Sequence, residues 1–446
     1  MKTPRKGTGD GLPTYRQSLL AAMKILLVAP LFAKWPVADS LRWKPRLIAC
    51  AALLMVWQPA VTLGDRLAEV GAALAELFPG SKRVGRTYQG FIKAWIAWSP
   101  RLLAALETHW RILVRQAAGD RWTHQGWVPL GVDGSRVAVP HTAANLKAFD
   151  CGGKDHSGPS AWLVTILHLG LNLPWAWKIA KATADERGLL RQMLHLLPAC
   201  TLLIADAGYT GYAFWRALQD AGHSFLIRVG ANTRLLTELG YAVEERDGIV
   251  YVWPHRQARA GEPPLVLRLI VLCHDSTPVY LLTNVLDPAK LTDVQAAEFY
   301  LLRWHLELFF RALKSTLGKR AMRSHAPVQA ALELRWAVLG LALLGLWTVQ
   351  SQMAEGCDPR KMSLAEALRH VRVVLRNPAR RCRRHETLAA RLARAVQDDY
   401  VRRGPKHSAD WPHKKNDGPP KAPQITPASA EQILAAQALI PRLRAA

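Results

Sequence analysis

The spacing of hydrophobic and polar positions changes twice along this chain. Up to about residue 118, apolar residues recur every three or four positions, which is typical of amphipathic helices. We predict helices there over Leu19–Phe32, Leu63–Leu77 and Phe91–Leu113. From Trp127 onward, short alternating or wholly apolar runs are separated by glycine and proline, which predicts strands. A helical pattern returns after Glu333, so the chain reads as an α/β protein flanked by helical regions.

The central region predicts three strands, a helix, a strand, a second helix and a strand. The segments are Trp127–Val139, Ala161–Leu169, Trp175–Ala182, Asp185–Leu197, Thr201–Tyr209, Tyr212–Ala221 and Ser224–Val229. This is the element order of an RNase H-like core, which is the fold class we predict. Three further strands, over 249–253, 265–273 and 279–283, predict a β-rich insertion before the next helix.

One predicted helix carries a polar stripe. Tyr300, Arg303, Glu307 and Lys314 are spaced three, four and seven residues apart, so they fall within about 60° of one another on a regular α-helix. The opposite arc is apolar and should pack on a core: Leu302, Leu306, Phe309 and Leu313. On an arbitrary helix such a stripe is most often a solvated face with i,i+4 charge pairing. The acidic residues upstream favour a functional site instead.

Two aspartates interrupt apolar strands upstream of this helix. Asp133 lies in the middle of a predicted strand and Asp206 ends another. Taken singly, each could be a turn residue, because a glycine follows within two positions. A buried carboxylate needs a proton, a partner or a metal. Together with Glu307 they form an oxygen-donor set suited to Mg²⁺ or Mn²⁺, and the six scattered cysteines offer no competing thiolate site.

These segments resemble the DDE transposases of insertion sequences. Tyr-x2-Arg-x3-Glu-x6-Lys is a signature of this family and is matched at all four positions. The runs DGSRVAVPHTAANLKAF and IADAGYTGYAFWRAL resemble its first and second catalytic segments, with Asp150 where a glycine is common and Ala207 where a polar residue is expected. The resemblance covers about residues 85–350. It implies Asp133, Asp206 and Glu307 as catalytic, metal-binding residues that hold two Mg²⁺ or Mn²⁺ ions.

The resemblance also implies the substrate. Tyr300, Arg303 and Lys314 would contact DNA phosphates, and the enzyme would cut the ends of its element and join the freed 3′-OH to target DNA. The implied partners are double-stranded DNA, as terminal inverted repeats and target, and a second copy of the chain in a DNA-bound homodimer. A formal charge of +25 agrees with a polyanionic partner. A metal-dependent nuclease without strand transfer, and a catalytically silent, domesticated DNA-binding protein, stay open as alternatives.

We predict six consecutive parts. They are a helical region (1–118), a first core part (119–230), a β-rich insertion (231–290), a second core part with the signature helix (291–355), a basic helical region (356–402), and a disordered linker with a short helix (403–446) that could serve dimer contacts. In the first part, Lys82, Arg83, Arg86 and Lys93 form a basic cluster that could bind end DNA or could equally be a solvated helix surface. Glu186 and Arg187 open a predicted helix, where an acid suits the helix dipole, and neither is expected to be catalytic. The resembling family often carries Glu-Arg there, so the resemblance also allows the pair to brace the site.

The apolar runs predict no membrane association. Leu47–Trp57 and Trp336–Val349 are shorter than the roughly 20 residues that span a bilayer, so both should be buried helices. The first residues are polar and do not resemble a secretory signal. With unpaired cysteines as well, we expect a bacterial, cytoplasmic protein associated with the nucleoid.

Overall fold

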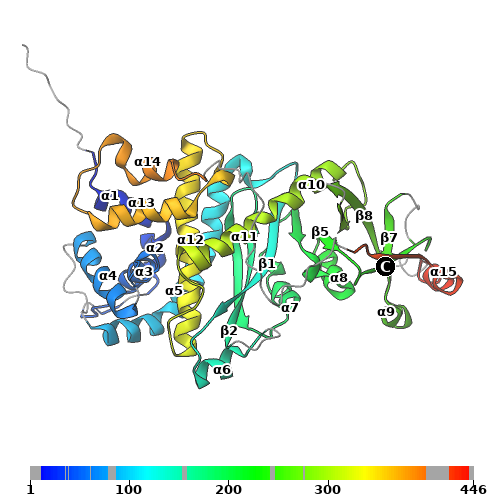
Figure 1. Cartoon of the computed structure of the whole chain (residues 1–446), viewed down its shortest axis with the longest axis horizontal. Coiled ribbons are helices and arrows are strands. Elements are labelled where there is room, and N and C mark those ends of the chain that lie inside the picture. Colours follow the sequence, from blue (N-terminus) through cyan, green and yellow to red (C-terminus); the bar gives the residue numbers. More distant parts are fainter. Residues whose placement is uncertain are drawn as a thin grey trace, which may run out of the picture.

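A ten-stranded mixed sheet forms the centre of the molecule (Figure 1). The computed structural model describes residues 12–35, 37–38, 40–60, 62–78, 87–152, 158–241, 247–274, 277–397 and 421–440. The strand order is β10-β6-β7-β8-β9-β5-β4-β1-β2-β3. The strands are β1 Val128–Ala138, β2 Ser160–His168, β3 Leu173–Lys181, β4 Thr201–Ala205, β5 Ser224–Val229, β6 Arg234–Thr237, β7 Ile249–Val252, β8 Leu265–His274, β9 Thr277–Thr283 and β10 Gln424–Pro427.

One half of this sheet has the predicted RNase H-like topology. β1, β2 and β3 form an antiparallel meander, and β4 and β5 lie parallel to β1 on its other side. Parallel neighbours need crossover connections. Helices α7 (Glu186–Arg191) and α8 (Tyr212–Asp220) lie in these two connections. The predicted fold class is confirmed, although the helix expected over Asp185–Leu197 is shorter than predicted and ends in a separate 3₁₀ turn.

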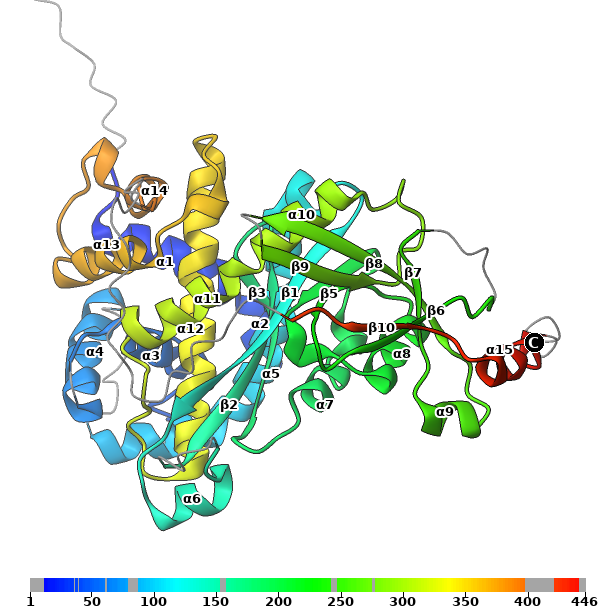
Figure 2. The same ribbon diagram turned by 45° about the vertical axis from the view of Figure 1, so that its right-hand side comes forward.

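The β-rich segment continues the same sheet. β9 pairs antiparallel with β5, and β8, β7 and β6 follow outward (Figure 2). The disordered linker predicted before the closing helix is wrong at its end, because Gln424–Pro427 is a strand paired with β6. Residues 403–420 of the predicted linker lie outside the described residues. Helix α15 (Ala430–Gln437) follows and buries Ala436 among Leu239, Tyr241 and Tyr251 of its own chain.

A helical lobe covers the other end of the sheet. Its elements are α1 Tyr15–Leu26, α2 Ala29–Ala33, α3 Pro45–Trp57, α4 Leu63–Leu77, α5 Tyr88–Ala118, α12 Pro327–Ala354, α13 Leu364–Arg376 and α14 Leu388–Ala393. In both views α12 runs between the sheet and the N-terminal helices (Figures 1 and 2). Lys82, Arg83 and Arg86 lie outside the described residues, so end-DNA binding by this region and the six-part division stay predictions.

Helix α12 is the central helix of the core. It has 28 residues, more than predicted, and is long and apolar enough to cross a membrane, but 89% of its most apolar window is buried inside the protein. This burial is typical of a core helix. Where α12 packs against α3, a glycine is needed at position 340. The carbonyl of Gly340 accepts a hydrogen bond from Trp57 Nε1 (3.1 Å), and Val56 occupies the space that a Cβ on residue 340 would fill.

Substituting Gly340 by alanine should therefore destabilise the fold. The new Cβ would lie 2.9 Å from Val56 Cγ1, and Val56 is itself buried, so one of the two helices must shift. We expect a loss of about 1–3 kcal/mol in the free energy of unfolding, measured by urea titration of tryptophan fluorescence. Gly71→Ala is the matched control, since a Cβ on that α4 residue meets nothing within 4 Å. It should stabilise by up to about 1 kcal/mol; equal effects at both positions would contradict the packing argument.

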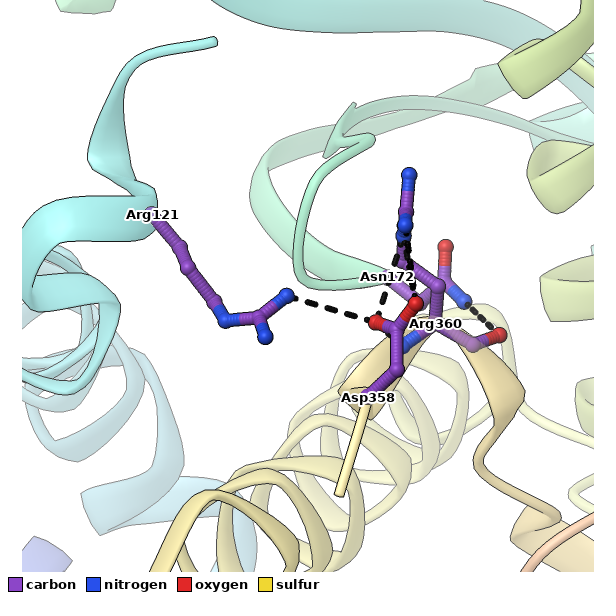
Figure 3. Close-up of polar contacts among 4 residues, drawn as sticks. All are labelled: Arg121, Asn172, Asp358 and Arg360. Carbon is purple, nitrogen blue, oxygen red and sulfur yellow. Dashed lines mark hydrogen bonds and ion pairs between the residues drawn. The ribbon is translucent and has the colours of Figure 1, made fainter. Parts of the chain in front are cut away.

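A polar cluster joins the turn after α5, the β2–β3 turn and the segment after α12 (Figure 3). Asp358 accepts hydrogen bonds from Arg360 Nη2 (2.8 Å) and Arg121 Nη1 (3.4 Å). Asn172, in the turn between β2 and β3, donates to the carbonyl of Arg360 (3.1 Å). The pKa of His305 is lowered mainly by burial, and the charge of Arg360 adds to this. The cluster therefore holds the β2–β3 turn against the segment that follows α12.

Candidate active site

Asp133 and Asp206 lie side by side where β1 and β4 meet. The two strands pair in parallel up to Gly131 and Ile204, and each aspartate follows two residues later. Burial raises the pKa of Asp133 to about 7, and the charges of Asp206 and Glu186 act in the same direction. A carboxyl group in this state exchanges its proton readily for a cation.

Both aspartates are oriented by the backbone that follows them. Asp133 Oδ1 accepts from the N–H of Gly134 (2.8 Å). Asp206 caps a 3₁₀ turn over Ala207–Tyr209 by accepting from the N–H of Gly208 (2.9 Å). Each carboxylate is thus held at one oxygen while the other stays available for a ligand.

The prediction of one regular helix for the four signature residues is wrong, because the structure divides this segment into three parts. α10 (Asp293–Leu302) carries Tyr300 and ends at Arg303, α11 (Trp304–Arg311) carries Glu307, and a π-helical turn over Ala312–Thr316 carries Lys314. At the break, Leu306 N–H donates to the carbonyl of Arg303 three residues back. The predicted buried arc is confirmed for Leu306, Phe309 and Leu313, and Leu302 is partly buried.

Arg303 connects this helix with the aspartates. Its Nη2 donates to Glu307 Oε1 (3.2 Å), and its guanidinium lies 5.7 Å from the centre of the Tyr300 ring. Burial opposes its charge, but Tyr300, Glu307 and Asp206 together raise the pKa of Arg303 above its usual value. The pKa of Lys314 is lowered by burial and by Arg320, while the charge of Asp133 opposes this shift. Both cations therefore lie within electrostatic reach of the aspartate pair.

The carboxylates suit a hard divalent cation in type, but they are not arranged as a finished metal site. In the described part of the chain, no three His, Cys, Asp or Glu side chains lie close enough to hold a metal ion as they stand. Glu307 is instead turned toward Arg303. Asp133 and Asp206 offer only oxygen donors, which Mg²⁺ and Mn²⁺ prefer. Glu307 could complete such a set only by exchanging its guanidinium partner for the cation.

Several residues of the first catalytic segment have structural roles. Thr142 caps α6 (Ala143–Phe149), and the buried Asn145 donates to the carbonyls of Pro140 (2.9 Å) and Ser324 (3.5 Å). These bonds fix the end of β1 to the loop that follows Lys314. The Pro-x-Thr and Asn of the segment therefore position the site without entering it.

Asp150 occupies a backbone conformation that favours glycine, with φ at +65°. Glycine would adopt this conformation without the strain that a side chain adds. The Asp150 carboxylate offsets the strain by accepting from Cys151 N–H (2.9 Å) and Thr183 Oγ1 (3.0 Å).

Glu186, which was not expected to be catalytic, contacts the residue after Asp133 and the turn after Asp206. Its Oε1 accepts a hydrogen bond from Tyr209 Oη (2.6 Å), and burial raises its pKa, with Asp206 adding to the shift. The only signal in the sequence was the Glu-Arg pair that opens a helix, which also fits an ordinary helix start.

Comparisons with known proteins match the same region. Residues 130–343 match the family described as transposase DDE domain. The chain is 26% identical over 258 residues to the transposase InsG for insertion sequence element IS4 of Escherichia coli, covering 54% of this chain and 57% of that protein. It is 31% identical over 148 residues to the putative transposase y4zB of Sinorhizobium fredii, covering 32% and 41%. The chain thus spans about half the length of the curated relatives it matches. A piggyBac transposase, solved as a synaptic complex with hairpin DNA, aligns over 88% of both chains with 10% identity and a TM-score of 0.44.

Proposed function

Because this chain belongs to the DDE transposases of insertion sequences, we propose that it cuts the ends of its own element and joins the freed 3′-OH to target DNA. The observation that carries the proposal is the approach of the Arg303–Glu307 pair and Lys314 to Asp133 and Asp206, which lie side by side. An acidic pair beside fixed cations suits a phosphodiester held next to divalent ions.

Asp133, Asp206 and Glu307 are the residues that would hold two divalent ions, Mg²⁺ or Mn²⁺. When bound, such ions activate the attacking oxygen and stabilise the leaving one. Asp133 must give up the proton that its environment favours, and Glu307 must turn away from Arg303. The acids therefore supply charge and position, and no covalent link to the protein is needed.

Arg303, Lys314 and Tyr300 would bind the DNA backbone. A guanidinium released by Glu307 can take a phosphate through two parallel N–H donors, and the Lys314 ammonium acts as a compact point charge. The Tyr300 hydroxyl can donate to a phosphate oxygen. In this proposal Arg303 has two alternative partners, the Glu307 carboxylate before DNA binds and a phosphate afterwards.

A joining assay tests the proposal and separates the alternatives. The full chain is incubated with duplexes that carry the element's own ends and with a supercoiled target plasmid, in Mg²⁺, in Mn²⁺ or in EDTA. We expect cut ends and end-to-plasmid joints with either ion and neither product in EDTA. Cutting without joints would identify a nuclease, and salt-sensitive binding without cutting would identify a silent DNA-binding protein. Asp133→Asn is the matched control and should bind DNA without cutting it.

We also propose that the active form is a homodimer on DNA, because two element ends must be cut and joined together. Its partners are then the terminal inverted repeats and the target duplex, and its place of action is the nucleoid of a bacterial cell. The formal charge of +25 supports a polyanionic partner. Sedimentation of the free chain and of its complex with end DNA tests the dimer.

A further inference from the structure

Glu186 contacts β1 and the turn that follows β4. It opens α7, in the connection between β3 and β4, and its carboxylate lies over the backbone of Gly134, the residue after Asp133. A Cβ on Gly134 would overlap Glu186 Oε1 and would also lie 2.9 Å from Trp162 Cζ2. Any side chain at position 134 would therefore displace the carboxylate.

The same helix also grips the turn that follows Asp206. Tyr209, whose ring is buried, donates its hydroxyl hydrogen to Glu186 Oε1 (2.6 Å). Arg187 Nη1 donates to the carbonyl of Thr210 (2.6 Å). Two consecutive side chains of α7 thus hold two consecutive residues, Tyr209 and Thr210, at the end of the turn that Asp206 caps.

The charge of Glu186 is compensated only in part. The charge of Arg136 on β1 lowers the pKa of Glu186 but does not cancel the rise caused by burial, and the Arg136 guanidinium lies 4.8 Å from the centre of the Trp162 ring. Asp133 and Asp206 both feel a repulsive charge at this place. Acidic groups held together in this way repel one another until a cation joins them.

We propose that Glu186 is a positioning residue for the metal site, which fixes Asp133 through the backbone of Gly134 and Asp206 through Tyr209 and adds a further negative charge beside them. It does not ligate the metal in this role. The inference rests on the proposed metal-dependent activity of Asp133, Asp206 and Glu307.

The test measures metal binding by the full chain without DNA. Mn²⁺ is titrated calorimetrically into the unchanged protein and into Glu186→Gln, which keeps the shape and an acceptor for Tyr209 but removes the charge. Tyr209→Phe removes the hydrogen bond and keeps the ring. We expect Glu186→Gln to weaken Mn²⁺ binding about tenfold and Tyr209→Phe to weaken it less, about threefold. The Mn²⁺ concentration for half-maximal end cleavage should rise in parallel.

Two control variants show whether a change in Mn²⁺ binding is specific to the site. Glu431→Gln removes an acid from the first turn of α15, far from the site, and should leave the titration unchanged. Asp133→Asn should abolish the binding. Thermal unfolding without metal should be nearly the same for the unchanged chain and Glu186→Gln.

The outcomes are distinguishable. If both Glu186→Gln and Tyr209→Phe bind Mn²⁺ like the unchanged chain while Asp133→Asn does not, the positioning role fails and the proposed function stands. A lower melting temperature of Glu186→Gln with unaltered Mn²⁺ affinity would also overturn the role, because a merely structural residue behaves in that way. If the unchanged chain and Asp133→Asn are alike in binding no Mn²⁺, the proposed function fails together with this inference.

Discussion

Replacing Glu307 by alanine is expected to lower divalent-dependent cleavage of the element ends by about 10³-fold or more, because a metal ligand contributes several kcal/mol to the transition state. The substitution also leaves the Arg303 guanidinium without its 3.2 Å partner. A free guanidinium can still bind phosphate, so affinity for end DNA should stay near that of the unchanged chain or rise slightly. Single-turnover cleavage and a filter-binding titration on the same duplex measure the two effects.

Glu298→Ala is the matched control for this result. Glu298 is an exposed acid on α10, nine residues before Glu307, and it accepts a hydrogen bond from Gln125 Nε2 (3.2 Å) at the surface. It should leave cleavage within about twofold, since exposed polar contacts contribute little. Cleavage that survives in Glu307→Ala, or that is lost equally in Glu298→Ala, would remove Glu307 from the proposed set.

Much of the core could be predicted from the sequence because each core strand is a short apolar run with clear boundaries. Ser224–Val229 was predicted with the bounds that the structure has, and the predicted strand around Asp133 differs by one residue at each end. Such strands are buried on both faces, so their composition alone identifies them. The same runs drew attention to Asp133 and Asp206, since an acid inside an apolar strand is unusual. Their catalytic role was implied by the family resemblance and stays a prediction.

The signature helix was predicted less well because helical projection assumes a regular period. A break at Arg303 and a π turn over Ala312–Thr316 change the angle at which Lys314 leaves the helix. Neither Gly nor Pro marks the break, and apolar and charged residues follow one another along this segment with the spacing of an ordinary amphipathic helix. Tertiary contacts of the buried Leu306 and Phe309 decide the local geometry, and no local pattern encodes them.

Other features depend on contacts between distant parts of the chain. β10 is four exposed residues that end in proline, and only its pairing with β6 makes it a strand. Glu186 joins the site through Tyr209, 23 residues later. A sequence gives the type of each residue but not which distant partner it meets. The strand β10 was therefore missed, and for Glu186 the resemblance allowed a bracing place but not the partners that it contacts.

A buried ion pair holds the loop after the signature helix. Lys319 Nζ lies 2.6 Å from Glu333 Oε1 on α12, with side chains 3% and 7% exposed. Glu333 Oε2 accepts from the N–H groups of Arg323 (3.0 Å) and Ser324 (3.2 Å) and from Ser324 Oγ (3.0 Å). Burial alone would raise the pKa of Glu333, but the Lys319 charge and these hydrogen bonds hold it below the usual 4.5. The carbonyl of Ser324 in this loop also accepts a hydrogen bond from Asn145, so the network connects α12 with the end of the signature helix.

Substituting Glu333 by alanine should therefore cost about 3–5 kcal/mol in the free energy of unfolding, because it leaves the Lys319 ammonium buried without a partner. A lowered carboxyl pKa stabilises the fold above the unfolded-state value and loses this effect as the pH falls through the folded-state value. The difference between the two proteins in urea unfolding should thus be full at pH 7 and shrink below about pH 4.5. Glu366→Ala, in an exposed pair with Arg369, is the control and should cost at most about 1 kcal/mol. A loss below about 1 kcal/mol in Glu333→Ala would mean that water or a shifted Lys319 relieves the charge, and the loop would then owe its position to packing alone.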